Sequence, residues 1–245
     1  MLKAHNLGRR FGNTWALHAL DLEVAPGEIQ CLLGANGAGK TTTINLFLGF
    51  LEPSCGAAFV NGNEVARDPR VARAQLAYVP EQVSLYPTLT GLENLDYFTK
   101  LAGKGAGDAS RSRLEALLDR VELARTAAHL PVERYSKGMR QKVGLAIALA
   151  KDARALLLDE PLSGLDPQAA NEFCALLRKL ADAGVAVLMA THDLFRAKEL
   201  ASRVGIMKGG RLLDNLAASD VSSAQLERIY LDHMRDGATA PGVQA

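Results

Sequence analysis

Apolar positions along the 245-residue chain follow two different periodicities. Short apolar runs typical of buried β-strands occur at 29–33, 77–79, 155–158, 185–189 and 204–207. Between most of them lie stretches with the period of amphipathic helices, at 41–51, 113–123, 138–150, 168–183 and 194–202. Strands that alternate with crossover helices predict an α/β fold built on a mostly parallel sheet.

One segment departs from this alternation. Residues 85–150 carry consecutive helical patterns, broken by the glycine-containing stretch 103–110, for which flexibility is expected. We therefore expect a helical insertion at 85–150 in a core formed by 1–84 and 151–220. Residues 221–245 are assigned to a C-terminal tail, and its last part, 236–245, is small, polar or contains Pro and Gly, which predicts disorder.

Composition and charge narrow the classes of function. The 48% hydrophobic and 22% charged residues are typical of a globular protein. The 28 Lys and Arg against 27 Asp and Glu give a net charge of +1, so electrostatics gives no reason to expect a nucleic-acid partner. Cys31, Cys55 and Cys174 lack metal-ligand spacing, and their odd number is expected of reduced thiols in a cytosolic protein. No apolar stretch approaches the length of a membrane span, so a protein that is neither secreted nor membrane-spanning is expected.

The strongest chemical signal is the segment GANGAGKT. It matches G-x-x-x-x-G-K-[ST] directly after the apolar run IQCLL and before a helical pattern, which is the context that a phosphate-binding loop requires. Its glycines let the backbone turn so that N–H groups converge on phosphate oxygens. Lys40 is expected to reach the β- and γ-phosphates, and the Thr41 hydroxyl to bind Mg²⁺. The predicted nucleotide-contacting residues of this loop are Gly34, Asn36, Gly37, Ala38, Gly39, Lys40, Thr41 and Thr42.

A pair of carboxylates follows the apolar run at 155–158. Asp159 and Glu160 would emerge together at the edge of a sheet. Because a buried and unpaired acidic pair is costly, a metal ion or a phosphate-bound water explains the two residues better than packing does. Asp159 is expected to hold Mg²⁺, and Glu160 to polarise the attacking water. The alternative is a strand that simply ends in solvated charges.

The order of these and further motifs resembles that of the nucleotide-binding subunits of ABC transporters, over residues 2–220. YVPEQ ends in Gln82, which resembles the family's Q-loop glutamine; LSGLDP contains Asp166 of the D-loop, and ATHD contains the switch histidine His192. Phe11, in RRFG, occupies the position of the aromatic residue that stacks on adenine, although the nearby Trp15 is an alternative.

The resemblance also has implications for the fold and for catalysis. It implies a P-loop NTPase (RecA-like) core with a mostly parallel sheet, an antiparallel β subdomain and an inserted α-helical signature subdomain. It further implies that Gln82 and His192 act with Glu160 in hydrolysis, and that Gln82 contributes to the Mg²⁺ site.

The segment VERYSKGMRQK raises a question of charge. Ser136 and Gly138 lie at the start of a predicted helix together with basic residues, although this end of a helix already carries a positive partial charge. The family's signature, usually LSGGQ, occupies this position, and the resemblance implies that Ser136 and Gly138 contact the ATP held by the opposite subunit. Three residues depart from LSGGQ. Lys137 is expected to add a charge-assisted contact to that phosphate, whereas Met139 cannot replace the hydrogen bonds of glutamine, and Tyr135 replaces leucine.

The leading interpretation is an ATP- and Mg²⁺-dependent ATPase subunit, peripheral on the inner face of the cell membrane. It would dimerise around two ATP molecules, with a second copy or a paired subunit, and power transport through separate integral-membrane permease subunits. The YSKGM variant resembles the export branch of the family, so export is favoured over import. A soluble ABC-type ATPase, for example in iron–sulfur assembly, is the alternative. A GTPase or small-molecule kinase is disfavoured because the chain lacks the guanine-reading NKxD motif.

Overall fold

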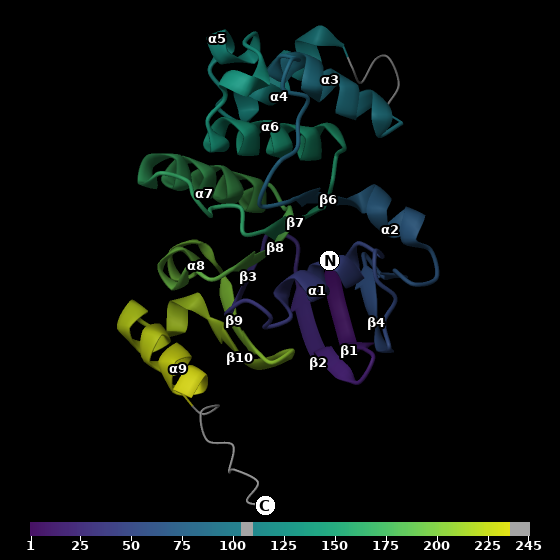
Figure 1. Ribbon diagram of the computed structural model, residues 1–245, viewed down its shortest axis with the longest axis vertical. Coiled ribbons are helices and arrows are strands. Elements are labelled where there is room, and N and C mark those ends of the chain that lie inside the picture. Colours follow the sequence, from purple (N-terminus) through teal and green to yellow (C-terminus); the bar gives the residue numbers. More distant parts are fainter. Residues whose placement is uncertain (104–109, 236–245) are drawn as a thin grey trace, which may run out of the picture.

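The computed structural model describes residues 1–103 and 110–235, and within these ranges the chain forms two β-sheets with flanking helices (Figure 1). The expectations for 104–109 and 236–245 lie outside the described residues. No helix in the described part of the chain is long and apolar enough to cross a membrane.

The larger sheet confirms the predicted α/β core. Its strand order is β10–β9–β3–β8–β7–β6, in which β9, β3, β8, β7 and β6 are parallel and β10 is antiparallel to β9. The predicted apolar runs lie in this sheet, apart from Val185 just before β8. They are apolar because helices cover both faces of the sheet and leave little need for polar side chains. Its strands are β3 (Ile29–Leu33), β6 (Leu76–Val79), β7 (Ala155–Asp159), β8 (Ala186–Thr191), β9 (Arg203–Lys208) and β10 (Arg211–Ala217).

A smaller antiparallel sheet forms the β subdomain that the resemblance implied. Its strand order is β2–β1–β4–β5, with β1 (Leu2–Phe11), β2 (Thr14–Val24), β4 (Cys55–Val60) and β5 (Asn63–Glu64). The buried side chains of this sheet pack with helix α1 (Lys40–Phe47) and one face of the central sheet in a common core. The two strand faces of β3 therefore meet different cores: Cys31 packs on the side of α7 (Pro167–Asp182), whereas Leu32 packs on the side of α1.

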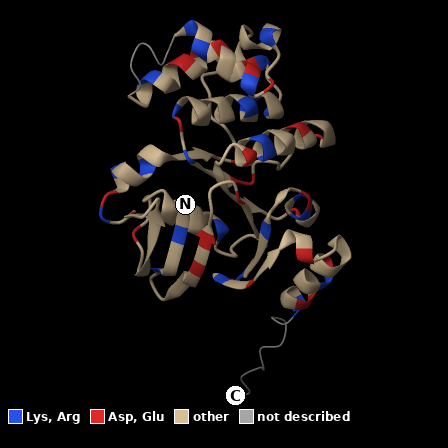
Figure 2. Cartoon of the chain, turned by 180° about the vertical axis from the view of Figure 1, so that it is seen from behind, with Lys and Arg blue, Asp and Glu red and all other residues tan. Residues whose placement is uncertain are grey.

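The inserted helical subdomain lies at one end of the molecule, shown at the top of Figure 1. It contains α3 (Gly91–Leu101), α4 (Arg111–Arg120), α5 (Arg125–Ala128), the 3₁₀ turn η1 (Val132–Arg134) and α6 (Lys137–Ala150). Helix α6 contacts α3 and α4 on one side and β6 and α7 on the other, so it joins the subdomain to the core. Figure 2 shows acidic and basic segments side by side on these helices, in agreement with ion pairs such as Lys100–Asp96 and Arg125–Asp119.

Side-chain caps fix where two helices of this subdomain begin. Thr90 and Glu93 form a reciprocal capping box at the start of α3, with the Glu93 carboxylate accepting from the Thr90 backbone N–H at 2.8 Å. At the start of α6, the Ser136 hydroxyl accepts the backbone N–H of Met139 at 3.2 Å. The buried Tyr135, immediately before this cap, donates its hydroxyl to the carbonyl of Ala127 at 2.6 Å. The predicted helix at 138–150 is thus confirmed with a defined first turn.

The sequence analysis assigned residues 221–245 to a tail, but part of this segment is a helix that packs on the core. Residues Ser223–Arg235 form α9, which packs against α8 (Leu194–Leu200) and β9. Leu226 of this helix is fully buried. At its far end, the Lys208 ammonium of β9 donates to the carbonyls of His233 and Met234, which lack partners within the helix. The sequence did contain a helical repeat, because Leu226 is buried and Ile229, Tyr230 and Met234 recur on the same face and pack against the core. The assignment to a tail overlooked this repeat.

We expect Leu226→Ala to lower the free energy of unfolding by about 2–4 kcal/mol, because the truncation leaves a cavity between α9 and the core. Leu231→Ala is the matched control on the same helix, since Leu231 is 41% exposed; its effect is expected to stay within about 0.5 kcal/mol. Urea denaturation followed by circular dichroism measures both. Equal effects of the two substitutions would show that α9 does not dock as described.

Candidate functional site

The glycine-rich loop connects the end of β3 to the start of α1. Gly39 caps α1 with φ of +104°, a conformation that L side chains rarely adopt, and a Cβ at this position would lie 2.7 Å from the carbonyl oxygen of Ala16. A Cβ on Gly34 would lie 2.5 Å from the carbonyl oxygen of Met207. The neighbouring strands therefore leave room only for glycine, and the backbone N–H groups at the start of α1 remain directed at a ligand.

Lys40 is held inside the loop that precedes it. Its side chain is 6% exposed, and its ammonium donates to the carbonyls of Gly34 at 2.6 Å and Ala35 at 3.3 Å. The same nitrogen lies 3.6 Å from Oε1 of Glu160. A buried ammonium is costly unless it is paired and hydrogen-bonded, so these contacts explain how the cation is retained beside the loop.

A cavity of about 410 Å³ opens above the loop. Its lining includes most of the phosphate-loop residues predicted from the sequence, together with both predicted carboxylates. Two residues that the sequence analysis did not select, Ala16 and Glu81, also line it. The complete lining is Ala16, Asn36, Gly37, Ala38, Gly39, Lys40, Thr41, Thr42, Glu81, Asp159 and Glu160.

Asp159 ends β7 beside the loop. Its Oδ1 is buried and has no hydrogen-bond partner. Burial raises the pKa of Asp159 above its ordinary value, although a hydrogen bond from Thr41 acts in the opposite direction. The neighbouring carboxylates of Glu160 and Glu81 raise the pKa further, whereas Lys40 lowers it. An oxygen with this environment is a suitable ligand for a cation, which would relieve both the desolvation and the repulsion.

Glu160 is fixed by the next strand of the sheet. Its backbone lies in the left-handed region with φ of 47°, and its N–H donates to the carbonyl of Ala190 at 2.9 Å. Its Oε2 accepts the backbone N–H of His192 at 3.3 Å and lies 2.9 Å from Nδ1 of the same residue. Its Oε1 is buried without a hydrogen-bond partner. One carboxylate oxygen is therefore used to position the side chain, and the other faces the Lys40 ammonium without a hydrogen bond of its own.

Phe11 and Trp15 lie on adjacent strands, β1 and β2. The pairs Arg10↔Trp15 and Phe11↔Thr14 put the two aromatic rings on opposite faces, because successive residues of a strand alternate. Ala16, which lines the cavity, shares the face of Thr14. Phe11 shares that face but does not belong to the cavity lining; it is 47% exposed, and its ring lies 4.7 Å from the guanidinium carbon of Arg9.

The structure brings Glu81, rather than the predicted Gln82, to the cavity. Gln82 is exposed and does not belong to the cavity lining. The pairing of Val79 with Leu158 aligns the ends of β6 and β7, so the residue two positions after Val79 reaches the same edge as Glu160. The predicted parallel strands implied that residues just after β6 and β7 lie at one edge of the sheet. The motif YVPEQ alone did not show which of its last two residues reaches the cavity.

The signature and D-loop residues lie outside the cavity of their own chain. Ser136 is exposed and its hydroxyl caps α6, whereas Gly138 is buried against Ala169 of α7. Asp166 is exposed and caps α7 by accepting the N–H of Ala169 at 2.9 Å. A single chain thus separates these three residues from its phosphate loop.

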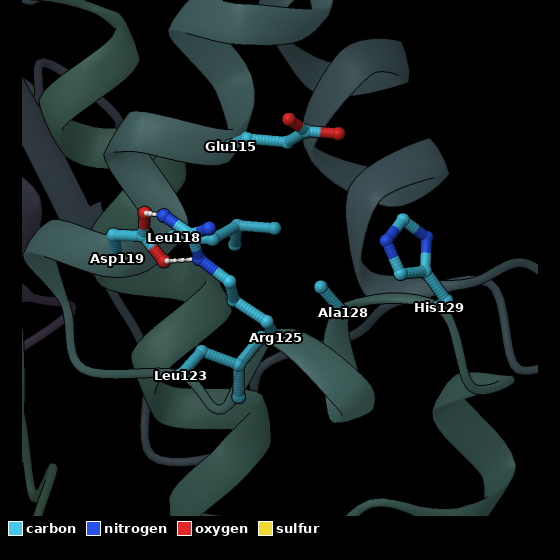
Figure 3. Close-up of a pocket in the computed structure, with 7 residues that line it drawn as sticks. All are labelled: Glu115, Leu118, Asp119, Leu123, Arg125, Ala128 and His129. Carbon is cyan, nitrogen blue, oxygen red and sulfur yellow. Dashed lines mark hydrogen bonds and ion pairs between the residues drawn. The ribbon is translucent and has the colours of Figure 1, made fainter.

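A second hollow, of about 200 Å³, lies within the helical subdomain (Figure 3). Figure 3 shows the guanidinium of Arg125 paired with both carboxylate oxygens of Asp119. The two hydrogen bonds between them are 2.7 and 3.2 Å long. Its remaining lining is Glu115, Leu118, Leu123, Ala128 and His129. This hollow has none of the glycine-rich backbone that characterises the first cavity.

Comparison with known proteins agrees with this geometry. The family model described as "ABC transporter" matches residues 17–163. The daunorubicin resistance ATP-binding protein DrrA3 of Streptomyces coeruleorubidus is 36% identical over 88% of this chain and 67% of its own length. The glutamine transport ATP-binding protein GlnQ of Escherichia coli is 35% identical over 88% of this chain and 90% of its own length.

Solved structures show the same fold. A structure described as the ATP-binding subunit of an ABC transporter has 30% identity and a TM-score of 0.80, covering 96% of this chain and 100% of that chain. The ATP-binding cassette MJ0796, solved as a dimer in a post-hydrolysis state with ADP and phosphate, has 26% identity and a TM-score of 0.77, covering 89% of this chain and 99% of its own. The protein therefore belongs to the ABC transporter family, in which it is an ATP-binding and ATP-hydrolysing subunit with the P-loop NTPase fold.

Proposed function

We propose that the chain dimerises with a second ATPase subunit around two ATP molecules and powers export through separate membrane-spanning subunits. The observation that carries this proposal is the division of the predicted site. Lys40, Asp159 and Glu160 share one cavity, whereas Ser136 lies outside it at the exposed start of α6. A second subunit that supplies Ser136 to this cavity would complete the site. The dimeric state of the MJ0796 cassette supports the same arrangement.

Mg²⁺ fits the donor groups of the cavity. Thr41 and the unpartnered Oδ1 of Asp159 provide one hydroxyl and one carboxylate oxygen. No cluster of three His, Cys, Asp or Glu suited to a metal ion exists among the described residues. This is the expected pattern for Mg²⁺, which is commonly held by one or two protein ligands together with phosphate oxygens and water. When bound there, the ion neutralises charge on the β- and γ-phosphates.

Glu160 is the proposed general base for water attack on the γ-phosphate. Its Oε1, which faces Lys40 in this structure, would take the proton once Lys40 moves to the phosphates, and its Oε2 is held by His192. Lys40 lies within 3.6 Å of Glu160, and we propose that it turns from the loop carbonyls to the β- and γ-phosphates when ATP binds. His192 acts as a positioning residue in this proposal, because it fixes the orientation of Glu160.

The proposed membrane partner would dock on an aromatic surface formed by Tyr86, Tyr97 and Phe98. The rings of Tyr86 and Tyr97 are 4.9 Å apart, and the two residues are 46% and 41% exposed. Because Tyr86 lies five residues after Glu81, a movement at the cavity can reach this surface through a short connection. Leu89, three residues after Tyr86, is only partly exposed.

The names of the relatives support a proposal for the direction of transport and for the location. The names of two of them refer to daunorubicin resistance and to Nod factor export, and the Nod factor protein of Paraburkholderia xenovorans is 36% identical over 89% of this chain and 71% of its own length. These names favour export, and they favour a transporter over the soluble iron–sulfur alternative. The protein would then lie at the inner face of the cell membrane through its contact with the permease.

Substitution of Glu160 by Gln is expected to retain ATP binding and to slow hydrolysis by about 10²-fold or more, because the amide cannot accept the proton of the attacking water. An ATP-stabilised dimer should accumulate, which size-exclusion chromatography with ATP detects. Glu199→Gln is the matched control, since Glu199 lies outside the cavity lining. Phosphate release at the normal rate by the Glu160 variant would contradict the proposed role.

Phe11→Ala is expected to weaken nucleotide binding by about 1–3 kcal/mol, the scale of base–aromatic stacking. Trp15→Ala should have a smaller effect, because Trp15 lies on the other face of the sheet. Titration with a fluorescent ATP analogue compares the two variants. The opposite order of affinities would assign the adenine contact to Trp15.

A mixture of Ser136→Arg and Lys40→Ala subunits tests the composite site. Each variant alone is expected to be nearly inactive, because every site of either homodimer contains a defect. In the mixed dimer, one site joins an intact phosphate loop to an intact signature, so part of the ATPase activity should return. Recovery requires that Ser136 serve the nucleotide of the other subunit. Failure of the mixture to form a dimer on ATP addition would contradict the proposed pairing.

A further inference from the structure

Glu81 gives the phosphate cavity an excess of negative charge. The cavity lining contains three carboxylates, those of Glu81, Asp159 and Glu160, and a single lysine, Lys40. The substrate is itself a polyanion, so a carboxylate at this position is unfavourable for nucleotide binding unless a cation compensates it. The compensating cation is expected close to Glu81 and outside the loop, because Lys40 already lies beside Glu160.

Helix α6 supplies this cation from the signature. The Lys137 ammonium lies 3.7 Å from Oε1 of Glu81 in the same chain. The Glu81 oxygen also accepts the hydroxyl of Ser163 at 2.9 Å, three residues after Glu160. Gly164 lies beside this lysine and has φ of +66°, a backbone conformation that L side chains rarely adopt. Lys137 thus connects the signature, the end of β6 and the segment that follows β7.

A second contact holds the same two segments together independently of charge. Gln141, one helical turn after Lys137, donates its side-chain amide to the carbonyls of Glu81 at 2.9 Å and Pro80 at 3.3 Å. Residues four positions apart share one face of a helix. Gln141 is 1% exposed. Helix α6 therefore holds the backbone before Gln82 with a buried amide and the carboxylate of Glu81 with an ion pair.

We propose that Lys137 is a positioning residue that acts within its own chain: it neutralises Glu81 at the phosphate cavity and so connects nucleotide binding there to the first turn of α6. That turn carries Ser136, which the proposed dimer presents to the nucleotide of the other subunit. This inference rests on the proposed function only for that last step; the ion pair and the cavity belong to a single chain.

The exposure of the ion pair suits this role. The side chains of Lys137 and Glu81 are 30% and 49% exposed, so their attraction is weakened by solvent and by salt. Such a contact can break and re-form as the charge of the cavity changes. The buried amide of Gln141 keeps α6 in place during that exchange, because leaving its backbone partners unsatisfied would be costly.

The assignment differs from the role expected from the sequence, in which Lys137 contacts the phosphate of the opposite subunit. The two roles separate experimentally. A contact across a dimer has no effect on nucleotide binding by a monomer. Neutralisation of Glu81 affects binding by each chain alone, and the effect disappears when Glu81 loses its charge.

The test is a double-mutant cycle on nucleotide affinity. Lys137→Met should weaken binding of a fluorescent ATP analogue with Mg²⁺ by about three- to tenfold at low salt, and by less at high salt. The protein is kept at a concentration at which sedimentation shows monomers, and hydrolysis is not measured. Adding Glu81→Gln to the Lys137 variant should restore the affinity. Glu81→Gln alone should bind at least as tightly as the unaltered protein.

Lys100→Met is the matched control, because Lys100 forms an exposed ion pair with Asp96 elsewhere in the helical subdomain; its affinity should not change. An unaltered affinity of the Lys137 variant, or a loss that Glu81→Gln does not restore, would overturn the proposal. If the Lys137 variant does not fold, as thermal unfolding would reveal, a weakened affinity of Glu81→Gln alone overturns it. Failure of the unaltered monomer to bind the analogue would instead contradict nucleotide binding itself.

Discussion

The electrostatic environment of Lys40 is the constraint on which the rest of the site depends. Its ammonium is nearly inaccessible to water, so the loop carbonyls and the Glu160 carboxylate must replace its hydration. The oxygen of Glu160 that faces this ammonium is Oε1, whereas His192 holds Oε2 and so fixes the orientation of the carboxylate. One arrangement of charges therefore combines the closed loop, the strained backbone of Glu160 and the histidine that follows the next strand.

The parallel sheet makes that arrangement possible. The pairs Val79↔Leu158 and Asp159↔Ala190 align the carboxyl ends of β6, β7 and β8. Residues that immediately follow these strands consequently meet at one edge, although they are far apart in the sequence. Ligands of open α/β sheets bind at this edge because the loops there are free of the constraints of the sheet. Glu81, Glu160 and His192 are brought together by strand register and need no long connecting loop.

The sequence predicted the parts of the fold whose burial leaves a continuous pattern. Strand β3 was predicted with its observed bounds because it is buried along its whole length. Strand β1 was not predicted, since its burial is irregular, its pairing with β2 shifts register, and Asn6 within it has a positive φ. The phosphate loop was predicted because glycine spacing reports directly on backbone geometry. Glu81 was missed because its role depends on the register of two strands, which no single motif contains.

The helix that carries the signature packs against both the helical subdomain and the core. Helix α6 packs on α3 and α4 of the helical subdomain and also on β6 and α7 of the core. Its Gln141 amide is buried against the carbonyls of Pro80 and Glu81, so the start of α6 and the end of β6 cannot separate without leaving these groups unsatisfied. Movement of the signature relative to the cavity is then concerted with movement of the segment after β6. That segment leads to Tyr86 and the exposed aromatic surface, so helix α6 and the segment after β6 together connect the phosphate cavity with this surface.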